Sequence, residues 1–539
     1  MRYSIEARYT CFKLFCVKGF VYGGSTRNNF ILYSTCLYLT QKLLLTEITK
    51  IYTLKTRQFL PLLMLMVLLS ATTATAQGRK AAIPFTYLPD NTEDQYNQSI
   101  TSKTLPLGAD GFVILSRNKP GEYAIERYNN TLKKAWSAAL PLAAEETLEA
   151  FVKNEEAALV VTHRTNDQGN QVLYAHRVDL RNGQKEKPVL LLEAPADVRK
   201  TGIAISPDGT KLLAYRFNVT GNQVVQGISG SLYDGKLQKL KDTKYNLSDL
   251  RGIVSAEVIV NDAADQFISL ISENMERLTV RQYTLKSPDA KGMSVLVGGM
   301  FDGKKVYITD GKYTLQPNGN LYGVVLTADE KTGDYYSLKA VKFDFENEDM
   351  VFAEEFRFTS EYLASVNKLD KSGGAKASRL EDIYLTDLIL TPEEKLIVLA
   401  EKKYMEGGEN SPYYAKEIHL FAYDQFMGTA WSSVLMKNQK APSDEAFTGI
   451  SYRYHLTGNT LNLLTLEELD GKYDLYLRRI DTSTGKAEAP KAAGLNVAND
   501  KNIAYVKDFT AWLSDRDLVT VVRPSKKANS LQLRRLQIK

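Results

Sequence analysis

Short runs of apolar residues, separated by turns that contain glycine, recur along residues 104–539. The clearest example is residues 201–246, where Pro207 fixes φ in the first turn and Gly209 supplies a positive φ. Its strand-like segments are 203–206, 212–215, 224–233 and a stretch that ends near Leu247. Four short antiparallel strands in about 45 residues correspond to one blade of a β-propeller. The segment is therefore predicted to fold as one four-stranded antiparallel sheet.

The rest of the chain repeats this pattern more loosely. The predicted units cover residues 104–142, 148–192, 201–246, 255–297, 313–358, 385–435, 450–492 and 509–538. Strand patterns dominate and convincing long helices are absent, which is typical of an all-β chain. Many similar units favour a single closed β-propeller over stacked sandwiches or a jelly roll. Because the units are longer than a usual blade, we expect seven to eight four-stranded blades.

The last unit contains only three predicted strands, so its sheet needs another segment to complete it. Ile83, Phe85 and Tyr87 alternate with polar or small residues ahead of the first unit. Pro84 is compatible with an outermost strand, because an edge strand tolerates a residue without an N–H group. We predict that this N-terminal strand pairs with the last unit and closes the ring.

A leader sequence precedes the repeats. Lys55 and Arg57 come before an apolar run at 59–69, and small residues then lead to Gln77. This order is typical of a secretory signal peptide, so 54–76 is predicted to be removed by cleavage near Ala76-Gln77. The mature chain would then be periplasmic or extracellular, with no stable membrane span.

Residues 1–53 are predicted to be a non-native extension, with translation starting at position 54. The alternative is a genuine N-terminal tail ahead of a signal anchor. The predicted β-propeller domain is therefore 77–539.

The charge balance changes once the leader is set apart. The whole chain carries a net charge of +5, but residues 1–76 hold nine of its Lys and Arg and only two of its Asp and Glu. Residues 77–539 keep 59 basic and 61 acidic residues, a net charge of −2, which gives no support for a nucleic-acid partner. Cys11, Cys16 and Cys36 all precede residue 77, which excludes disulfides, thiol nucleophiles and cysteine-ligated zinc from the mature chain. We expect a monomer without cofactor or metal.

Two resemblances concern parts of the chain. Residues 203–215 resemble the Ser-Pro-Asp-Gly repeats of TolB-type and related WD40-like propellers. Residues 358–466 also resemble an uncharacterised family of secreted proteins from Gram-negative bacteria. That resemblance is carried by Ala400 and Glu401, by a W-x5-K-x-Q pattern and by a following aspartate, which are Trp431, Lys437, Gln439 and Asp444. It implies a fold and a location but no activity.

Candidate chemistry is sparse. His163 and His176 lie symmetrically about a Gly-Asn turn, so a regular hairpin would place them opposite each other. Without a third ligand, they are interpreted as a structural pair rather than a metal site. Catalytic residues stay unassigned, because a propeller brings carboxylates together from distant units.

Two long insertions mark the candidate ligand site. Residues 359–382 link the fifth and sixth units, and residues 402–415 enlarge a hairpin of the sixth. Loops between units and loops between second and third strands emerge on the same face of a propeller, and loops often carry function. Tyrosines offer contact area at low entropic cost, and lysines attract acidic groups. The predicted ligand-binding residues are Lys402, Lys403, Tyr404, Tyr413 and Tyr414.

The favoured function is a binding or scaffolding module for a protein or glycan of the cell envelope. The alternative is a carbohydrate-active or other hydrolytic enzyme with carboxylates in the propeller pore. A pair of carboxylates from non-adjacent units, about 5–10 Å apart in a dry pore, would favour the enzyme. A third possibility, a structural subunit of an envelope complex, predicts a broad exposed apolar patch.

Overall fold

The computed structural model describes residues 82–538, apart from 90–95, 97, 144, 197–198, 221–223, 288, 371–375, 409, 501, 526–527 and 529. The predicted extension, signal peptide and cleavage site therefore lie outside the described residues. Among the residues that are described, no helix is long and apolar enough to cross a membrane. The description below concerns the compact unit Lys80–Lys539.

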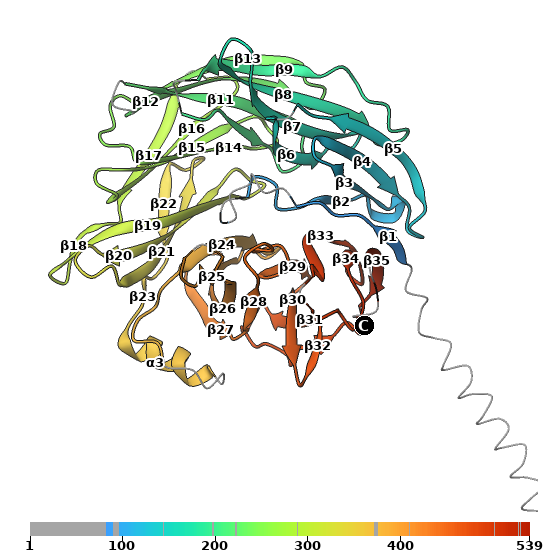
Figure 1. Ribbon diagram of the computed structural model, residues 1–539. Helices are drawn as coiled ribbons and strands as arrows, with labels where there is room; N and C mark the ends of the chain where they lie inside the picture. The colour runs from blue at the N-terminus through green and yellow to red at the C-terminus, as the bar shows by residue number, and fades with distance from the viewer. Residues whose placement is uncertain are drawn as a thin grey trace, which may run out of the picture. The chain divides into compact units, whose positions relative to one another are not determined.

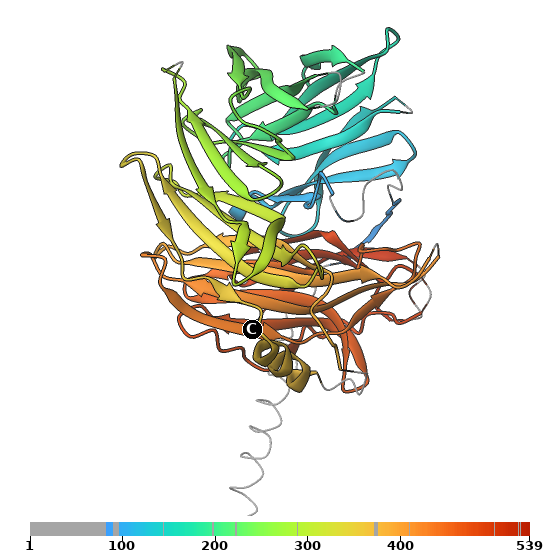
Figure 2. The ribbon, with the colours of Figure 1, turned by 90° about the vertical axis from the view of Figure 1, so that its left-hand side faces the viewer.

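Eight antiparallel sheets follow one another in chain order around a ring, as the colours of Figures 1 and 2 show. The first four blades are built from strands that pair in sequence order. They are β2 (Thr104–Pro106), β3 (Phe112–Lys119), β4 (Glu122–Tyr128) and β5 (Lys134–Pro141); β6 (Thr147–Lys153), β7 (Ala157–Thr165), β8 (Asn170–Asp179) and β9 (Val189–Pro195); β10 (Gly202–Ile205), β11 (Lys211–Val219), β12 (Val225–Asp234) and β13 (Lys239–Asn246); and β14 (Ser255–Val260), β15 (Gln266–Ser272), β16 (Arg277–Tyr283) and β17 (Ala290–Leu296).

The fifth and sixth blades carry additional short strands, whereas the seventh and eighth sheets have four strands each. The strands of these four blades follow in chain order. They are β18 (Gly299–Phe301), β19 (Lys304–Leu315), β20 (Leu321–Asp329), β21 (Tyr335–Asp344), β22 (Asp349–Phe352) and β23 (Phe356–Arg357); β24 (Ile383–Leu390), β25 (Leu396–Met405), β26 (Tyr413–Tyr423), β27 (Thr429–Leu435) and β28 (Gln439–Ala441); β29 (Tyr452–Thr457), β30 (Thr460–Leu469), β31 (Lys472–Asp481) and β32 (Lys491–Ala492); and β33 (Tyr505–Ser514), β34 (Asp517–Val522) and β35 (Leu531–Gln537). The prediction of an all-β propeller is thus confirmed, with eight blades.

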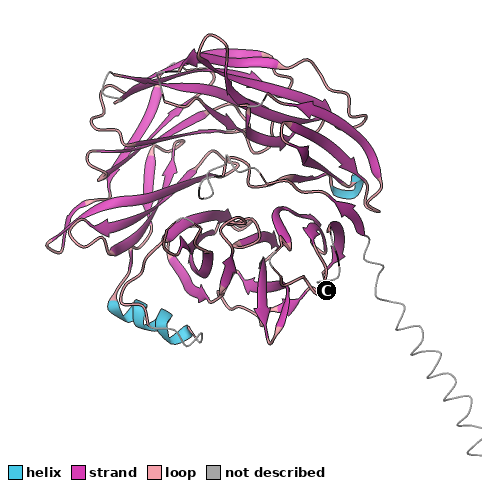
Figure 3. Ribbon diagram, in the orientation of Figure 1, coloured by secondary structure: helices cyan, strands magenta, loops and turns pink. Residues whose placement is uncertain are grey.

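Helix is rare among the described residues, as Figure 3 shows. A 3-10 turn, η1 (Gly108–Asp110), follows β2, and α3 (Ser360–Leu369) lies in the predicted insertion 359–382. The α3 helix begins after Thr359, whose side chain accepts a hydrogen bond from the Tyr362 N–H group at 3.2 Å.

The hydrophobic core lies between neighbouring blades. Every residue of β15 and of β20 is buried, because both faces of a central strand pack against an adjacent sheet. This packing explains why the sequence shows short continuous apolar runs instead of a strict alternation of apolar and polar residues.

The ring is closed by β1 (Ala82–Phe85), which pairs antiparallel with β35 and completes the eighth sheet in the order β1-β35-β34-β33. Phe85 lies opposite Leu531, and its ring lies 4.9 Å from that of Phe509, between centroids. Pro84 lies on this outermost strand, as predicted, where no further strand requires its missing N–H group. The predicted closure by the N-terminal strand is confirmed.

A tryptophan on the outer strand joins neighbouring blades at two places. Trp136 on β5 donates its indole N–H to the Leu180 carbonyl of the next blade at 3.2 Å. Trp431 on β27 donates its indole N–H to the Thr482 carbonyl of the next blade at 2.9 Å. In each case a glycine with a positive φ makes room for the ring, where a Cβ atom would collide with it; these are Gly183 and Gly485.

Candidate functional site

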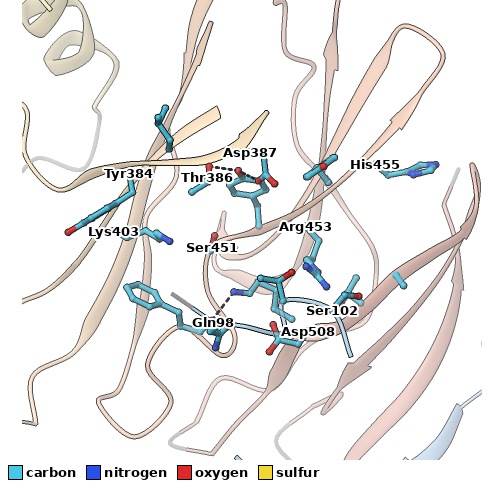
Figure 4. A pocket seen from close by; sticks show the side chains of 18 of the residues that line it. Gln98, Ser102, Tyr384, Thr386, Asp387, Lys403, Ser451, Arg453, His455 and Asp508 are labelled. Carbon is cyan, nitrogen blue, oxygen red and sulfur yellow. Dashed lines mark hydrogen bonds between the residues drawn. The ribbon is translucent and has the colours of Figure 1, made fainter. Parts of the chain in front are cut away.

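A cavity of about 1080 Å³ lies where strands of five blades converge. Its walls come from β2, β19, β24, β29 and β33, together with the segment that leads from β1 into β2. Figure 4 shows side chains that extend into this space from several of these strands. Its aromatic side chains are Tyr96, Tyr384, Phe447, Tyr452, Tyr454 and Trp512. Its charged side chains, His455 apart, are Asp310, Lys312, Asp387, Lys403, Arg453, Lys507 and Asp508.

Two β-bulges aim carboxylates at the cavity. The register of β19 with β20 shifts between Ile308 and Asp310, and the register of β24 with β25 shifts between Leu385 and Asp387. The bulged residue is a threonine in both strands, and each hydroxyl donates to a carbonyl of the next strand. A bulge turns the following side chain out of the regular alternation. Both aspartates consequently line the cavity instead of the sheet interior.

Asp310 and Asp387 are held by protein donors. Asp310 accepts hydrogen bonds from the backbone N–H groups of Leu385 and Gly311, both at 2.8 Å. Asp387 accepts one from the Tyr452 hydroxyl at 2.5 Å. Burial raises the pKa of both carboxyls despite these bonds.

Glu257 on β14 is not among the lining residues, but it interacts electrostatically with Asp310 and Lys312, which line the cavity. Its side chain is exposed to solvent, yet protein surrounds it closely enough that burial raises its pKa to about 7. The positive charge of Lys312 acts in the opposite direction, and the negative charge of Asp310 raises the pKa further. Glu257 and Asp387 come from non-adjacent blades, and Lys312 interacts electrostatically with both.

The cations of the cavity are less fully partnered than its carboxylates. Within the described residues, neither Lys312 nor Arg453 forms an ion pair or a side-chain hydrogen bond with another residue. Lys507 donates to the Phe447 carbonyl at 3.2 Å. The Lys403 ammonium lies 5.5 Å from the centroid of the Phe447 ring and 5.9 Å from that of the Tyr384 ring.

The structure divides the five predicted ligand-binding residues between the two faces of one hairpin. Lys403 lines the cavity, and Tyr413 packs against Phe447 with ring centroids 5.0 Å apart. Lys403 and Tyr413 thus lie at the edge of the cavity.

The other three predicted residues lie outside the cavity lining. The rings of Tyr404 and Tyr414 stack at 5.0 Å, and the Lys402 ammonium lies 5.7 Å from the Tyr404 ring. Lys416 and Lys440 also lie over these rings. We call these five residues the outer basic–aromatic patch. Their separation from the cavity follows from strand alternation, since Tyr404 and Tyr414 pair directly and so share one face.

Most of the cavity was not predicted from the sequence. Arg453, Tyr454, Lys507 and Trp512 lie on the first strands of the last two blades, and no local pattern in the sequence indicates that these strands meet at one cavity. One signal was available: a Thr-Asp pair interrupts the apolar pattern of both β19 and β24.

The prediction that His163 and His176 face each other is wrong. In the β7–β8 hairpin His163 pairs with Leu173, and His176 pairs with Val160. The Asn166 side chain accepts hydrogen bonds from the N–H groups of the turn and centres it earlier than the sequence symmetry suggested. Among the described residues, no group of three or more His, Cys, Asp or Glu side chains is placed to hold a metal ion.

A buried polar network supports one wall of the cavity. The Lys437 ammonium lies 2.7 Å from the Glu401 carboxylate, and both side chains are 0% exposed. Ser451, which lines the cavity, donates its hydroxyl to Glu401 at 2.6 Å and its N–H group to Gln439 at 3.0 Å. Three residues of the W-x5-K-x-Q resemblance therefore hold the start of β29 in place.

No protein-family model matches the chain, so the resemblance to a secreted Gram-negative family stays a prediction. No curated protein sequence matches it either.

Several solved structures are similar to the chain at low identity. The polysaccharide lyase Uly1 shares 11% identity over 75% of this chain and 92% of its own, with a TM-score of 0.36. A prolyl endopeptidase shares 9% identity over 80% of this chain, with a TM-score of 0.39, and the match spans 55% of that enzyme. The β-propeller domain of the Trilobed protease from Pyrococcus furiosus shares 11% identity over 74% of this chain and 97% of its own, with a TM-score of 0.32.

Proposed function

We propose that the protein is a secreted or periplasmic binding module that holds a glycan or a protein segment of the cell envelope in its central cavity. The observation that carries this proposal is the cavity lining itself. Ligand sites are concave and combine aromatic surface with a few convergent polar groups, and a volume of about 1080 Å³ accommodates an extended ligand. Asp310 and Asp387 are held by protein donors, which suits a preformed binding wall.

The test compares aromatic truncations inside and outside the cavity. Tyr384 and Tyr454 are 38% and 39% exposed, so replacing either with Ala should remove ligand contact with little loss of core. The matched control is Phe426→Ala, because Phe426 is 75% exposed and absent from the cavity lining. We expect Tyr384→Ala and Tyr454→Ala to weaken retention of envelope polysaccharide or protein fractions on the immobilised chain, and Phe426→Ala to leave it unchanged. Equal retention by all variants would contradict the proposal.

A hydrolytic enzyme is the second candidate, and two carboxyls favour it. Glu257 and Asp387 come from non-adjacent blades and both interact electrostatically with Lys312. Burial raises the pKa of each, which suits a carboxyl that acts as a general acid. The wide polar cavity and the solvent exposure of Glu257 differ from the dry pore expected for such a pair. Release of new chain ends from a polysaccharide or peptide, lost in both Glu257→Gln and Asp387→Asn, would establish the enzyme.

A further inference from the structure

Of three cations that line the cavity, two interact electrostatically with the third. Arg453 on β29, Lys507 on β33 and Lys403 at the end of β25 all line it, and Figure 4 shows Arg453 and Lys403 extending from two different strands. Burial lowers the pKa of Lys507, and the positive charges of Arg453 and Lys403 act in the same direction. The negative charges of Asp508 and Glu401 act in the opposite direction on Lys507. Three like charges that line one cavity favour the binding of an anion there.

The carboxylates near this cluster interact with it, but each also has another partner. Asp508 forms an ion pair with Lys103 at 3.7 Å. Glu401, which also acts on Lys507, is paired with Lys437 behind the cavity wall. Asp387 accepts the hydroxyl of Tyr452. Arg453 interacts electrostatically with Asp387, but among the described residues it forms no ion pair and no side-chain hydrogen bond, so its guanidinium can donate to a ligand.

Aromatic rings flank this cationic cluster. The Tyr384 ring lies beside Lys403, and Tyr454 follows Arg453 directly in β29. Both residues line the cavity and are partly exposed, so part of each side chain is accessible to a ligand. Exposed aromatic faces suit the apolar C–H faces of sugar rings, while their hydroxyls serve polar substituents. Hydroxyl and amide side chains that line the cavity, among them Gln98, Ser102 and Thr510, match a ligand rich in hydroxyl groups.

We propose that the ligand of the cavity is an acidic glycan, one of whose carboxylate or sulfate groups binds between Lys403, Arg453 and Lys507. This inference rests on the proposed binding function. The planar guanidinium of Arg453 is suited to a two-point hydrogen bond with either anion, and the two lysines add point charges. The neighbouring rings hold the sugar that carries the anionic group.

Calorimetric titration of the full chain with defined probes tests this proposal. The probes are an oligogalacturonate for carboxylate, a chondroitin sulfate oligosaccharide for sulfate, a neutral cello-oligosaccharide, and an oligoglutamate peptide. We expect at least one acidic oligosaccharide to bind, with an affinity that falls as salt is added, and the neutral oligosaccharide to bind much more weakly. The arm that binds identifies the anionic group.

Charge-removing variants locate the contact. Arg453→Gln should lower the affinity by about 10-fold or more, because a hydrogen bond to a charged group contributes about 1.5–3 kcal/mol. Lys416→Gln makes the same change of charge in the outer basic–aromatic patch and should leave the affinity within about twofold. Arg453→Lys should restore part of the binding. Equal melting temperatures of these variants exclude a folding defect as the cause.

The outcomes separate this inference from the proposed function. Suppose that neutral and acidic oligosaccharides bind equally well and that Tyr454→Ala weakens both. This result would overturn the preference for an acidic glycan but would still support the proposed binding function. Binding of oligoglutamate alone would overturn the glycan class. An unaltered affinity in Arg453→Gln with a loss in Lys416→Gln would move the site to the outer patch. No binding in any arm, with no retention of envelope fractions, would overturn both proposals.

Discussion

At the scale of residues, a buried ion pair between Glu401 and Lys437 supports one wall of the cavity. Glu401 and Lys437 are both 0% exposed, and Gln439 and Ser451 complete their hydrogen bonds. Burial lowers the pKa of Lys437, while the Glu401 charge acts against that shift. A buried pair of this kind adds little net stability compared with apolar residues, but removal of one partner leaves an uncompensated charge. The pair therefore fixes the geometry of the wall.

Lys437→Ala should reduce the free energy of unfolding by about 3–5 kcal/mol, because it strands the Glu401 carboxylate in the interior. Chemical denaturation measures this loss. The double variant Glu401→Gln/Lys437→Met should lose much less, since no charge is left buried. The control Lys440→Ala, at an exposed position nearby, should change stability by no more than about 0.5 kcal/mol. A small loss in Lys437→Ala would show that solvent reaches Glu401.

Glu146 supplies a pH-dependent contribution. Burial alone would raise the pKa of Glu146, but the hydrogen bond from Thr162 at 2.5 Å, the N–H group of Ala143 and nearby His176 lower it from 4.5 to about 2. Because the folded pKa lies below the unfolded one, this stabilisation is present above about pH 4.5 and is lost as the pH falls towards about 2.

Glu146→Gln should therefore lower the stability at neutral pH and flatten its decline between about pH 4.5 and about pH 2. Urea midpoints measured across this range check the expectation. Glu145→Gln, at the exposed neighbouring position, should keep the wild-type pH profile. An unchanged slope in Glu146→Gln would refute the assigned role.

At the scale of strands, the position of β1 has the largest consequence. An eighth blade without it would expose the unpaired edge of β35 and uncover Phe509. Phe85 contributes most to this closure, because it is the buried residue of the strand.

Phe85→Ala should destabilise the fold by about 3–5 kcal/mol, the usual cost of truncating a buried phenylalanine. Phe426→Ala removes the same atoms from an exposed turn and should cost no more than about 0.5 kcal/mol. Thermal and urea denaturation compare the two. If both variants lose equally little, the N-terminal strand does not contribute to stability as its pairing indicates.

The hairpin of β25 and β26 presents different residues to its two sides. Tyr413→Ala removes a ring that supports Phe447, which in turn contacts Lys403 at the cavity. We expect ligand affinity to fall by about two- to tenfold, the equivalent of one aromatic contact of about 0.5–1.5 kcal/mol. Tyr414→Ala alters only the outer basic–aromatic patch and should leave the affinity unchanged. The reverse order in the same calorimetric titration would place the ligand on the outer patch.

At the scale of the whole molecule, the sequence predicts the architecture better than the site. Turn residues such as Pro207 and Gly209 mark a blade locally, and Phe85 with its alternating neighbours marks the closing strand, because both signals depend on adjacent residues. The cavity depends on side chains from five blades and on bulges that precede Asp310 and Asp387. Neither the convergence of the blades nor the register shifts can be derived from local patterns.

The predicted signal-peptide cleavage would decide how many residues precede the closing strand. Cleavage near Ala76-Gln77 would leave five residues ahead of β1, so the closing strand would stay whole. Intact-mass and peptide analysis of the secreted protein should therefore begin at Gln77 and lack every peptide that contains Cys11 or Cys36. Cleavage beyond Phe85 would remove the strand that pairs with β35 and should lower the melting temperature of the product. Recovery of residues 1–50 in the mature chain would contradict both the signal peptide and the alternative start at position 54.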